Sequence, residues 1–269
     1  MSWAGCVRAA NGVAIVLCLA ACKANSSAQR AAPPSQPIAS SVAPTVLAIV
    51  AKPAETVSVA GREPSVRPLL VPQAARALTP SSHFDINFWG NAVNTHTLLD
   101  AAGKGAVPVS EARFLWGQGQ LYVAFYAGDL DLEVREKSHD GPVWKDDSVT
   151  LSFFTEAGKK RLISVSPTGV LADGTCPGDA KNLGDTRCDL HWESHARVGV
   201  DYDGTLNKLG DFDEEWNIQF AIPLRALDAA PEPGTRLRFA LDRCDMAFDG
   251  QRACGAWGTS LTPAELVLQ

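Results

Sequence analysis

The chain has 269 residues and a formal net charge of −6, and its length fits one large domain or two small ones. The negative charge is unevenly placed, because only Glu55 and Glu63 of the 30 acidic residues precede residue 81. An acidic globular part argues against nucleic acid as a partner, since the binding of phosphates requires a basic surface.

The N-terminus has the pattern of an export signal. An apolar run at residues 13–21 follows a basic residue and is too short to span a bilayer as a helix, which takes about 20 residues. Leu19-Ala20-Ala21-Cys22 resembles a bacterial lipobox. The resemblance implies a lipoprotein signal peptide over residues 1–21, lipidation at Cys22 and, because Lys23 follows, an outer-membrane location on the periplasmic or surface face. An ordinary signal with a coincidental cysteine is the alternative.

Residues 22–80 are predicted to form a tether that begins at the lipidated cysteine. Residues 23–80 contain nine of the 17 prolines and no aromatic residue. Such a composition cannot bury enough apolar surface to offset the entropy lost on ordering. We expect a disordered, mildly basic tether, suited to anionic lipid or serving solubility alone. Contact with the membrane would then be made only through the N-terminal lipid.

Four cysteines follow the tether: Cys176, Cys188, Cys244 and Cys254. An even number of cysteines in an exported domain indicates disulfides. Three pairings are possible. We expect Cys176–Cys188 and Cys244–Cys254, because the members of each pair lie close together in the sequence.

A β-hairpin is the first clear unit of the globular part. Two alternating runs flank the stretch Gly117-Gln118-Gly119-Gln120, and a loop of this length sets their register. The register places six residues on one apolar face: Trp116 opposite Leu121, Phe114 opposite Val123, and Ala112 opposite Phe125. Trp116 is therefore expected in the core.

Residues 148–154 form the predicted central strand, in which apolar and polar residues alternate. The preceding loop, residues 139–143, presents Trp144 near the rim of the sheet, although a tryptophan here can equally plug the core. Asp147 is expected to hold this loop in place.

Further short strands are predicted at residues 161–165, 170–171, 197–200, 216–222, 236–244, 253–257 and 266–268. A long loop is expected at residues 172–190 and one helical turn at residues 224–227. Many short strands with turns between them indicate an all-β fold. We predict an antiparallel β-sandwich over residues 81–269, preceded by the disordered tether.

Three motifs resemble family 9 carbohydrate-binding modules, a branch of the DOMON-like superfamily. They are Leu121-Tyr122-Val123, Trp144-x-x-Asp147-Ser148-Val149 and Phe220-Ala221-Ile222-Pro223-Leu224. The resemblance implies a β-sandwich that binds glucans, xylans or small sugars, often at a chain end held between two aromatic rings. The sequence has no nucleophile motif and no Gly-rich phosphate loop, and no pair of carboxylates stands out for glycoside hydrolysis. We therefore expect non-catalytic binding, at the cell envelope because of the lipoprotein signal, in support of carbohydrate catabolism, with any glycoside hydrolase on a separate partner.

The resemblance also suggests the residues of the carbohydrate site. Trp144 matches one ring position, and Trp257 is the candidate second ring. An aromatic ring buries the C–H face of a pyranose at about 25 cal/mol per Å², and polar groups around it fix the hydroxyls. The family commonly has an acidic ligand where this chain has Thr150, which binds hydroxyls less strongly than a charged acceptor. Arg161 is a candidate polar contact, or else a solvated turn charge.

Two other functions remain open. Some DOMON-like domains hold haem b for electron transfer, and Met246 is a candidate axial ligand. A cell-surface structural or interaction domain without a ligand is the third reading, which the departure at Thr150 favours.

No cofactor is required for sugar binding, but the sequence offers candidates for two kinds of metal site. Cys188, His191 and His195 have a zinc-like spacing, although an exported cysteine is more often in a disulfide. Structural calcium, which the family often carries, could bind Asp211-x-Asp213-Glu214-Glu215 or Asp201-x-Asp203 through oxygen ligands.

Overall fold

The computed structural model describes residues 67–269, except residues 107, 209, 211, 248 and 260–261. The chain divides into two units, Met1–Ser58 and Val59–Gln269, and all described residues belong to the second. The predicted signal peptide, the lipidation at Cys22 and most of the tether lie outside the described residues and stay predictions. Among the described residues, no helix has the length and apolar character needed to cross a membrane.

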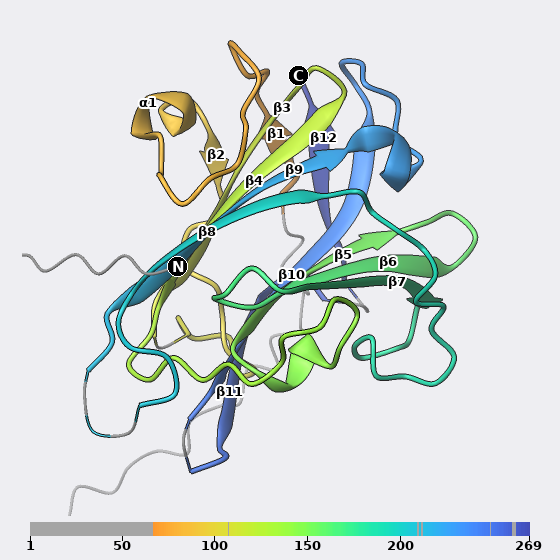
Figure 1. Ribbon diagram of the computed structural model, residues 1–269. Coiled ribbons are helices and arrows are strands. Elements are labelled where there is room, and N and C mark those ends of the chain that lie inside the picture. Colours follow the sequence, from red (N-terminus) through yellow and green to blue (C-terminus); the bar gives the residue numbers. More distant parts are fainter. Residues whose placement is uncertain (1–66, 107, 209, 211, 248, 260–261) are drawn as a thin grey trace, which may run out of the picture. The chain divides into compact units, whose positions relative to one another are not determined.

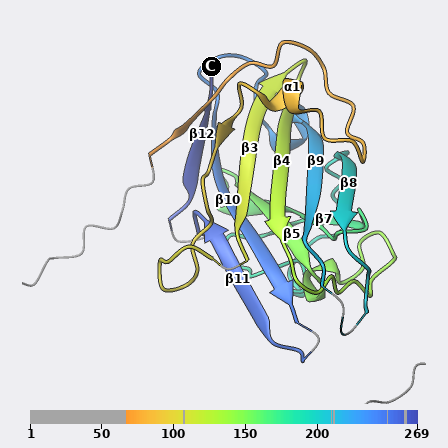
Figure 2. The ribbon, with the colours of Figure 1, turned by 90° about the vertical axis from the view of Figure 1, so that its left-hand side faces the viewer.

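The described part is a sandwich of two β-sheets (Figure 1). The seven-stranded sheet has the order β1-β12-β10-β5-β6-β7, with β11 also paired to β10, and the five-stranded sheet has the order β2-β3-β4-β9-β8 (Figure 2). Paired strands are antiparallel except for β1 and β12. The elements are β1 Leu69–Val71, α1 Ile86–Trp89, β2 Val93–Asn94, β3 Ser110–Gly117, β4 Gln120–Gly128, η1 Val143–Lys145, β5 Ser148–Phe154, β6 Lys159–Val165, β7 Leu171–Pro177, β8 Arg197–Asp203, β9 Glu215–Pro223, η2 Leu224–Leu227, β10 Arg236–Met246, β11 Arg252–Trp257 and β12 Ala264–Leu268.

The folded part begins earlier than predicted. Leu69, Leu70 and Val71, which we had placed in the tether, form β1 and pair with β12 at the end of the chain. Val71 is fully buried in the main core. A short apolar triplet in a proline-rich setting thus gains its stability from a partner strand far away in the sequence.

The predicted hairpin is confirmed in register. β3 pairs with β4 so that Trp116 lies opposite Leu121 and Phe114 opposite Val123. The turn at Gln118 and Gly119 has positive φ at both residues, 49° and 73°, as expected for a two-residue hairpin loop that matches the twist of the strands. Trp116 is buried, and its indole Nε1 donates a hydrogen bond to the carbonyl of Gln269 at 2.8 Å.

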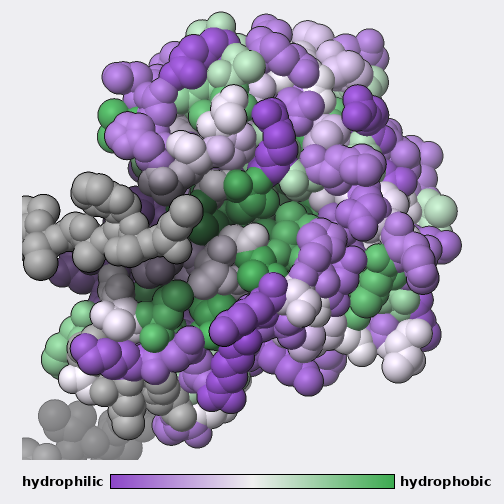
Figure 3. All heavy atoms as spheres, in the orientation of Figure 1, coloured by the Kyte–Doolittle hydropathy of each residue, from purple (hydrophilic) through white to green (hydrophobic). Residues whose placement is uncertain are grey.

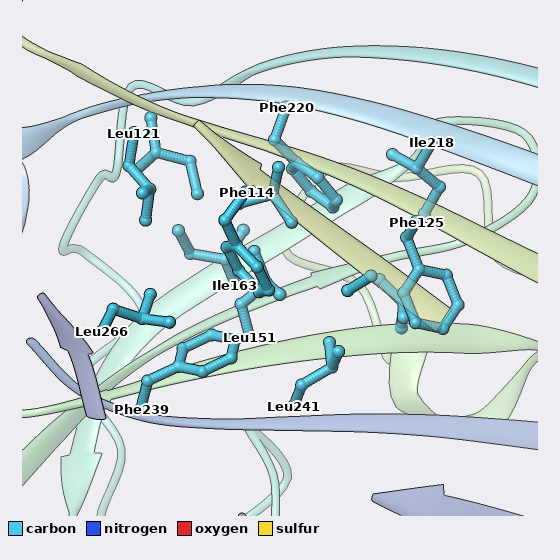
Figure 4. Close-up of a cluster of buried hydrophobic side chains, with 14 of the residues drawn as sticks. Phe114, Leu121, Phe125, Leu151, Ile163, Ile218, Phe220, Phe239, Leu241 and Leu266 are labelled. Carbon is cyan, nitrogen blue, oxygen red and sulfur yellow. The ribbon is translucent and has the colours of Figure 1, made fainter. Parts of the chain in front are cut away.

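One main hydrophobic core lies between the two sheets. Figure 4 shows Phe114 and Phe220 of the five-stranded sheet facing Leu151 and Phe239 of the seven-stranded sheet. The rings of Phe114 and Phe239 meet edge to face, with centroids 5.3 Å apart. Because successive strand residues point to opposite faces, the polar residues of β5 lie on the outer face of the seven-stranded sheet: Ser148, Thr150 and Ser152.

Both predicted disulfides are confirmed. Cys176–Cys188 links β7 to the segment after it, and Cys244–Cys254 joins residues directly opposite each other in β10 and β11. β7 is longer than the predicted two residues, since residues 172–177, which we expected in a loop, pair with β6. The sequence of this strand is polar and contains a glycine, so its pattern did not predict a strand. Pairing with β6 stabilises it.

The edge strands of the two sheets, β7 and β8, are joined by the segment 178–196. On the face of Figure 1, Figure 3 shows hydrophobic residues at the bottom of a hollow between β8 and the seven-stranded sheet, with hydrophilic residues around its rim.

Candidate functional site

Trp144 lies on the outer face of the seven-stranded sheet. It belongs to η1, directly before β5, and it is half-buried. Its ring packs at the margin of a second apolar cluster that includes Val143, Leu162 and Leu183. Trp144 therefore does not plug the core between the sheets, and the residue remains partly exposed to solvent.

Two buried aspartates hold the loop that carries Trp144. Asp146 Oδ2 accepts hydrogen bonds from the backbone N–H groups of Arg135 at 2.8 Å and Glu136 at 2.7 Å. Asp147, which is fully buried, accepts from Glu133 N and from Met246 N in β10. These bonds fix the loop against the end of the sheet, and they confirm the predicted structural role of Asp147.

The disulfide-linked segment after β7 lies along one edge of the indole. At Gly184, an added Cβ would come within 2.8 Å of the Trp144 Nε1 atom. A side chain at this position would have to displace the indole. The segment therefore sets how much of the Trp144 ring is open.

Polar side chains continue from Trp144 across the same outer face. Thr150 in β5 lies between Ser164 of β6 and Asp242 of β10 in the strand register. Its hydroxyl donates to Ser164 Oγ at 3.0 Å. Directly opposed residues of paired strands share a face, so Thr150, Ser164 and Asp242 form one row across three strands.

Asp242 is the charged member of this row. Burial raises the pKa of Asp242 to about 6, although the cations of Lys160 and Arg252 oppose the shift. Lys160 in β6 is itself almost fully buried, and burial lowers its pKa. The outer face thus carries a carboxylate and an ammonium in a poorly hydrated setting, beside partly exposed Thr150.

Asp242 was missed by the sequence reasoning. The available signal was a charged residue in the middle of a predicted strand. Its neighbours Phe239 and Leu241 point toward the core, so Asp242 lies on the outer face. Its place beside Thr150 depends on the pairing of β5 with β10, which lie about 90 residues apart in the sequence.

The two candidate rings are not brought together. Trp257 in β11 pairs with Leu241 and packs against the main core, with its ring 6.0 Å from that of Phe239. Trp257 therefore lies on the inner face of the seven-stranded sheet, and Trp144 on the outer face. The predicted two-ring clamp of Trp144 and Trp257 does not form.

Arg161 also faces away from Thr150. It projects from β6 on the inner side, where its guanidinium lies over the Trp192 ring at 5.3 Å. It forms an ion pair with Asp228 and donates to the carbonyl of Ala226. Arg161 thus joins the seven-stranded sheet to η2, and it is neither a solvated turn charge nor a neighbour of Trp144.

A buried carboxylate cluster beside the Trp144 loop has the oxygen atoms that a calcium ion prefers. Asp129, Asp147 and Asp245 bring carboxylate oxygens within 4.8 Å of one another. The guanidinium of Arg243 donates to Asp129 Oδ2 at 2.7 Å and to Asp245 Oδ1 at 3.1 Å. Calcium requires six to eight oxygen ligands, and here an arginine already supplies the positive charge. The cluster fits a guanidinium and not a calcium ion.

The cluster nevertheless remains short of positive charge. Burial and the carboxylate of Asp129 raise the pKa of Asp147 to about 9. A raised pKa favours the neutral form of Asp147, and a neutral carboxyl lowers the cost of placing three carboxyl groups around one guanidinium.

Of the two kinds of metal site predicted from the sequence, the zinc site is not formed and the calcium site stays a prediction. The zinc-like set of Cys188, His191 and His195 is not formed, because Cys188 is in a disulfide. Asp213 accepts hydrogen bonds from Leu132 N and Thr205 N, and Asp211 lies outside the described residues. Calcium at the acidic loops stays a prediction, as does haem ligation by Met246, which is half-buried at the end of β10.

Two solved structures share the fold. A proposed carbohydrate-binding protein from Bacteroides uniformis matches with a TM-score of 0.56 and 11% identity, over 76% of this chain and 100% of that chain. A family 9 carbohydrate-binding module from Caldicellulosiruptor kristjanssonii, in complex with cellotriose, matches with a TM-score of 0.50 and 14% identity, over 76% of this chain and 94% of that chain. No family model and no curated protein matches the sequence. The chain thus has the fold of the family 9 modules, as its motifs predicted.

Proposed function

We propose that the chain binds carbohydrate without breaking a bond, on the outer face of the seven-stranded sheet around Trp144, Thr150 and Asp242. The observation that carries this proposal is the row of Thr150, Ser164 and Asp242, which shares the outer face of the sheet with the half-buried Trp144. Hydroxyl and carboxylate groups that share a face with an aromatic ring offer a sugar both hydrogen bonds and an apolar surface. The fold shared with the cellotriose-bound module supports the same reading.

The exposed part of the Trp144 ring would stack on one face of a pyranose. The gain scales with the apolar area removed from water, at about 25 cal/mol per Å². The backbone hydrogen bonds of Asp146 and Asp147 hold the loop before binding. Little ordering entropy is then lost when the sugar stacks, which favours affinity.

Asp242 would replace the acidic ligand that the family has at the position of Thr150. The two residues lie directly opposite each other in β10 and β5, so a carboxylate on the neighbouring strand reaches the same part of the face. With a pKa of about 6, Asp242 is mostly ionised at neutral pH and accepts strong charge-assisted hydrogen bonds from hydroxyls.

The proposed ligand is a β-linked glucan-type oligosaccharide, because the structural neighbour was solved with cellotriose. A xylan-like chain or a single small sugar offers the same ring faces and hydroxyls. We place this activity at the cell envelope, on an outer-membrane lipoprotein anchored through Cys22, in support of carbohydrate catabolism. Any hydrolysis would come from a separate partner, since a glycosidase needs two carboxyl groups facing each other across the scissile bond.

A glycan array with the full chain would identify the ligand, and isothermal titration would then compare variants. Trp144→Ala is expected to weaken binding by more than tenfold. Trp257→Ala is the matched control: it removes an indole from the opposite face of the same sheet and should leave the affinity unchanged.

Thermal unfolding of both variants would show that they remain folded. Equal affinity of Trp144→Ala and the wild type would reject the site. A Soret band in the visible spectrum of the purified chain would favour the haem reading over the sugar reading.

A further inference from the structure

A second cluster of ligand-type side chains lies away from the proposed sugar site, between the edge strands β7 and β8. A cavity of about 230 Å³ opens there and is lined by His139, Asp173, Glu193 and His195. The apolar floor comes from Leu171 of β7 and Val198 of β8. The cavity therefore spans the open edge of the sandwich.

Three ligand atoms already converge at this cavity. A ring nitrogen of His139 and carboxylate oxygens of Asp140 and Glu193 lie within 4.8 Å of one another. His139 Nδ1 is 3.1 Å from Asp140 Oδ2. Ligands of one zinc ion stand about 2.0–2.2 Å from the metal, so only small side-chain movements would place one ion among all three.

One oxygen of a buried carboxylate at the same cavity has no hydrogen-bond partner among the described residues. Asp173 is 1% exposed, and its Oδ2 accepts a hydrogen bond from Ser194 N at 2.8 Å. Its Oδ1 is buried and accepts no hydrogen bond from the described part of the chain. Leaving such an oxygen unpaired is unfavourable, which indicates a cation or donor that the described part of the chain does not provide.

The charge balance also favours a cation. Asp140, Asp173 and Glu193 bring three carboxylates together, and no lysine or arginine is among the described residues that line the cavity. The cluster around Arg243 shows the contrast, because there a guanidinium supplies the positive charge.

We propose that this cavity binds a divalent transition-metal ion of the Zn²⁺ class, with His139, Asp140 and Glu193 as ligands. Imidazole and carboxylate together suit zinc, copper or nickel, whereas calcium and magnesium prefer oxygen alone. Asp173 Oδ1, or His195 at the rim, completes the coordination.

The metal would join the loop that precedes Trp144 to the connection between β7 and β8. His139 and Asp140 precede Trp144 by five and four residues, and Glu193 lies in the segment that follows Cys188. An ion held between them ties the loop of Trp144 to the β7–β8 connection. Metal binding should therefore raise the thermal stability of the chain, because a ligand that binds only the folded state stabilises it.

Isothermal titration of Zn²⁺ into the metal-stripped full chain tests the site. We expect one ion per chain for the wild type, and affinity at least tenfold lower for His139→Ala and for Glu193→Gln. His191→Ala is the matched control, since the His191 side chain is fully exposed and its ion-pair partner is Asp189. This variant should bind zinc like the wild type. Calcium should produce no comparable binding.

Two results would overturn the proposal. One is the absence of stoichiometric zinc binding by the folded wild-type chain. The other is an equal loss of affinity in His139→Ala and His191→Ala, which would indicate scattered surface histidines. Sugar titrations of the same variants keep this test separate from the proposed carbohydrate function, because a chain can fail one binding test and pass the other.

Discussion

Protonation of Asp242 should weaken sugar binding as the pH falls through about 6, where the pKa of this buried carboxyl lies. At pH 7 about nine tenths of the groups are ionised, and at pH 5 about one tenth, by the titration of a single site. A hydrogen bond to a charged acceptor is worth about 1 kcal/mol more than one to a neutral acceptor. This difference corresponds to about fivefold in affinity for the fully protonated form.

Weighting the two forms by their populations predicts that affinity falls about threefold between pH 7 and pH 5. The direction follows because the sugar binds the ionised form of Asp242 more tightly. At low pH the carboxyl is mostly protonated, and losing this proton on binding costs affinity. Isothermal titration with the best ligand of the glycan array, at the two pH values, measures the effect.

Asp242→Asn is the control for this prediction, because the amide has a similar size and does not titrate. Its affinity should be lower than that of the wild type at pH 7 and nearly independent of pH. Unfolding midpoints at both pH values would verify that Lys160 still lies in a folded sheet after its counter-charge is removed. A wild-type affinity that does not change with pH, or an unchanged pH dependence in Asp242→Asn, would refute the role of the carboxylate.

Three further predictions address the support of the site and the core. Gly184→Ala places a methyl group against the Trp144 indole and should reduce sugar affinity severalfold with little change in the unfolding midpoint; unchanged affinity would mean that the ring tolerates displacement. Asp147→Ala leaves two backbone N–H groups without an acceptor. It should lower the free energy of unfolding, measured by urea denaturation, by about 2–4 kcal/mol. A loss below about 1 kcal/mol would contradict the structural role of Asp147. Phe239→Ala opens a cavity between the sheets and should cost about 3–5 kcal/mol; near-neutral stability would argue against close packing of this ring in the core.

Much of the fold is readable from local sequence patterns. The alternation in residues 110–128 and the glycines around Gln118 set the register of β3 and β4 without further information. The alternation in β5 also separates Val149, toward the core, from Thr150, toward solvent. Local periodicity succeeded here because the two faces of each strand have different environments.

Local patterns failed where a residue's surroundings depend on a distant strand. β1 is stabilised by β12 at the other end of the folded part, so it did not stand out in a proline-rich sequence. Asp242 gains its role from the pairing of β10 with β5. Such long-range partners cannot be deduced from short-range alternation.

The position of Trp257 could have been deduced. The predicted pairing of Cys244 with Cys254 sets the β10–β11 register, which places Leu241 opposite Trp257. Trp257 lies three residues from Cys254, so it must face the side of the sheet opposite to the disulfide. Combining the disulfide with strand alternation would have assigned this indole to the inner face.

A crystal structure of the chain with a bound cello-oligosaccharide tests the proposed carbohydrate site most directly. We expect a pyranose stacked on the Trp144 ring, with its hydroxyls within hydrogen-bond distance of Thr150 and Asp242. A sugar held on the inner side near Trp257 or in the cavity between β7 and β8, with the outer face of β5 and β10 bare, would contradict this assignment.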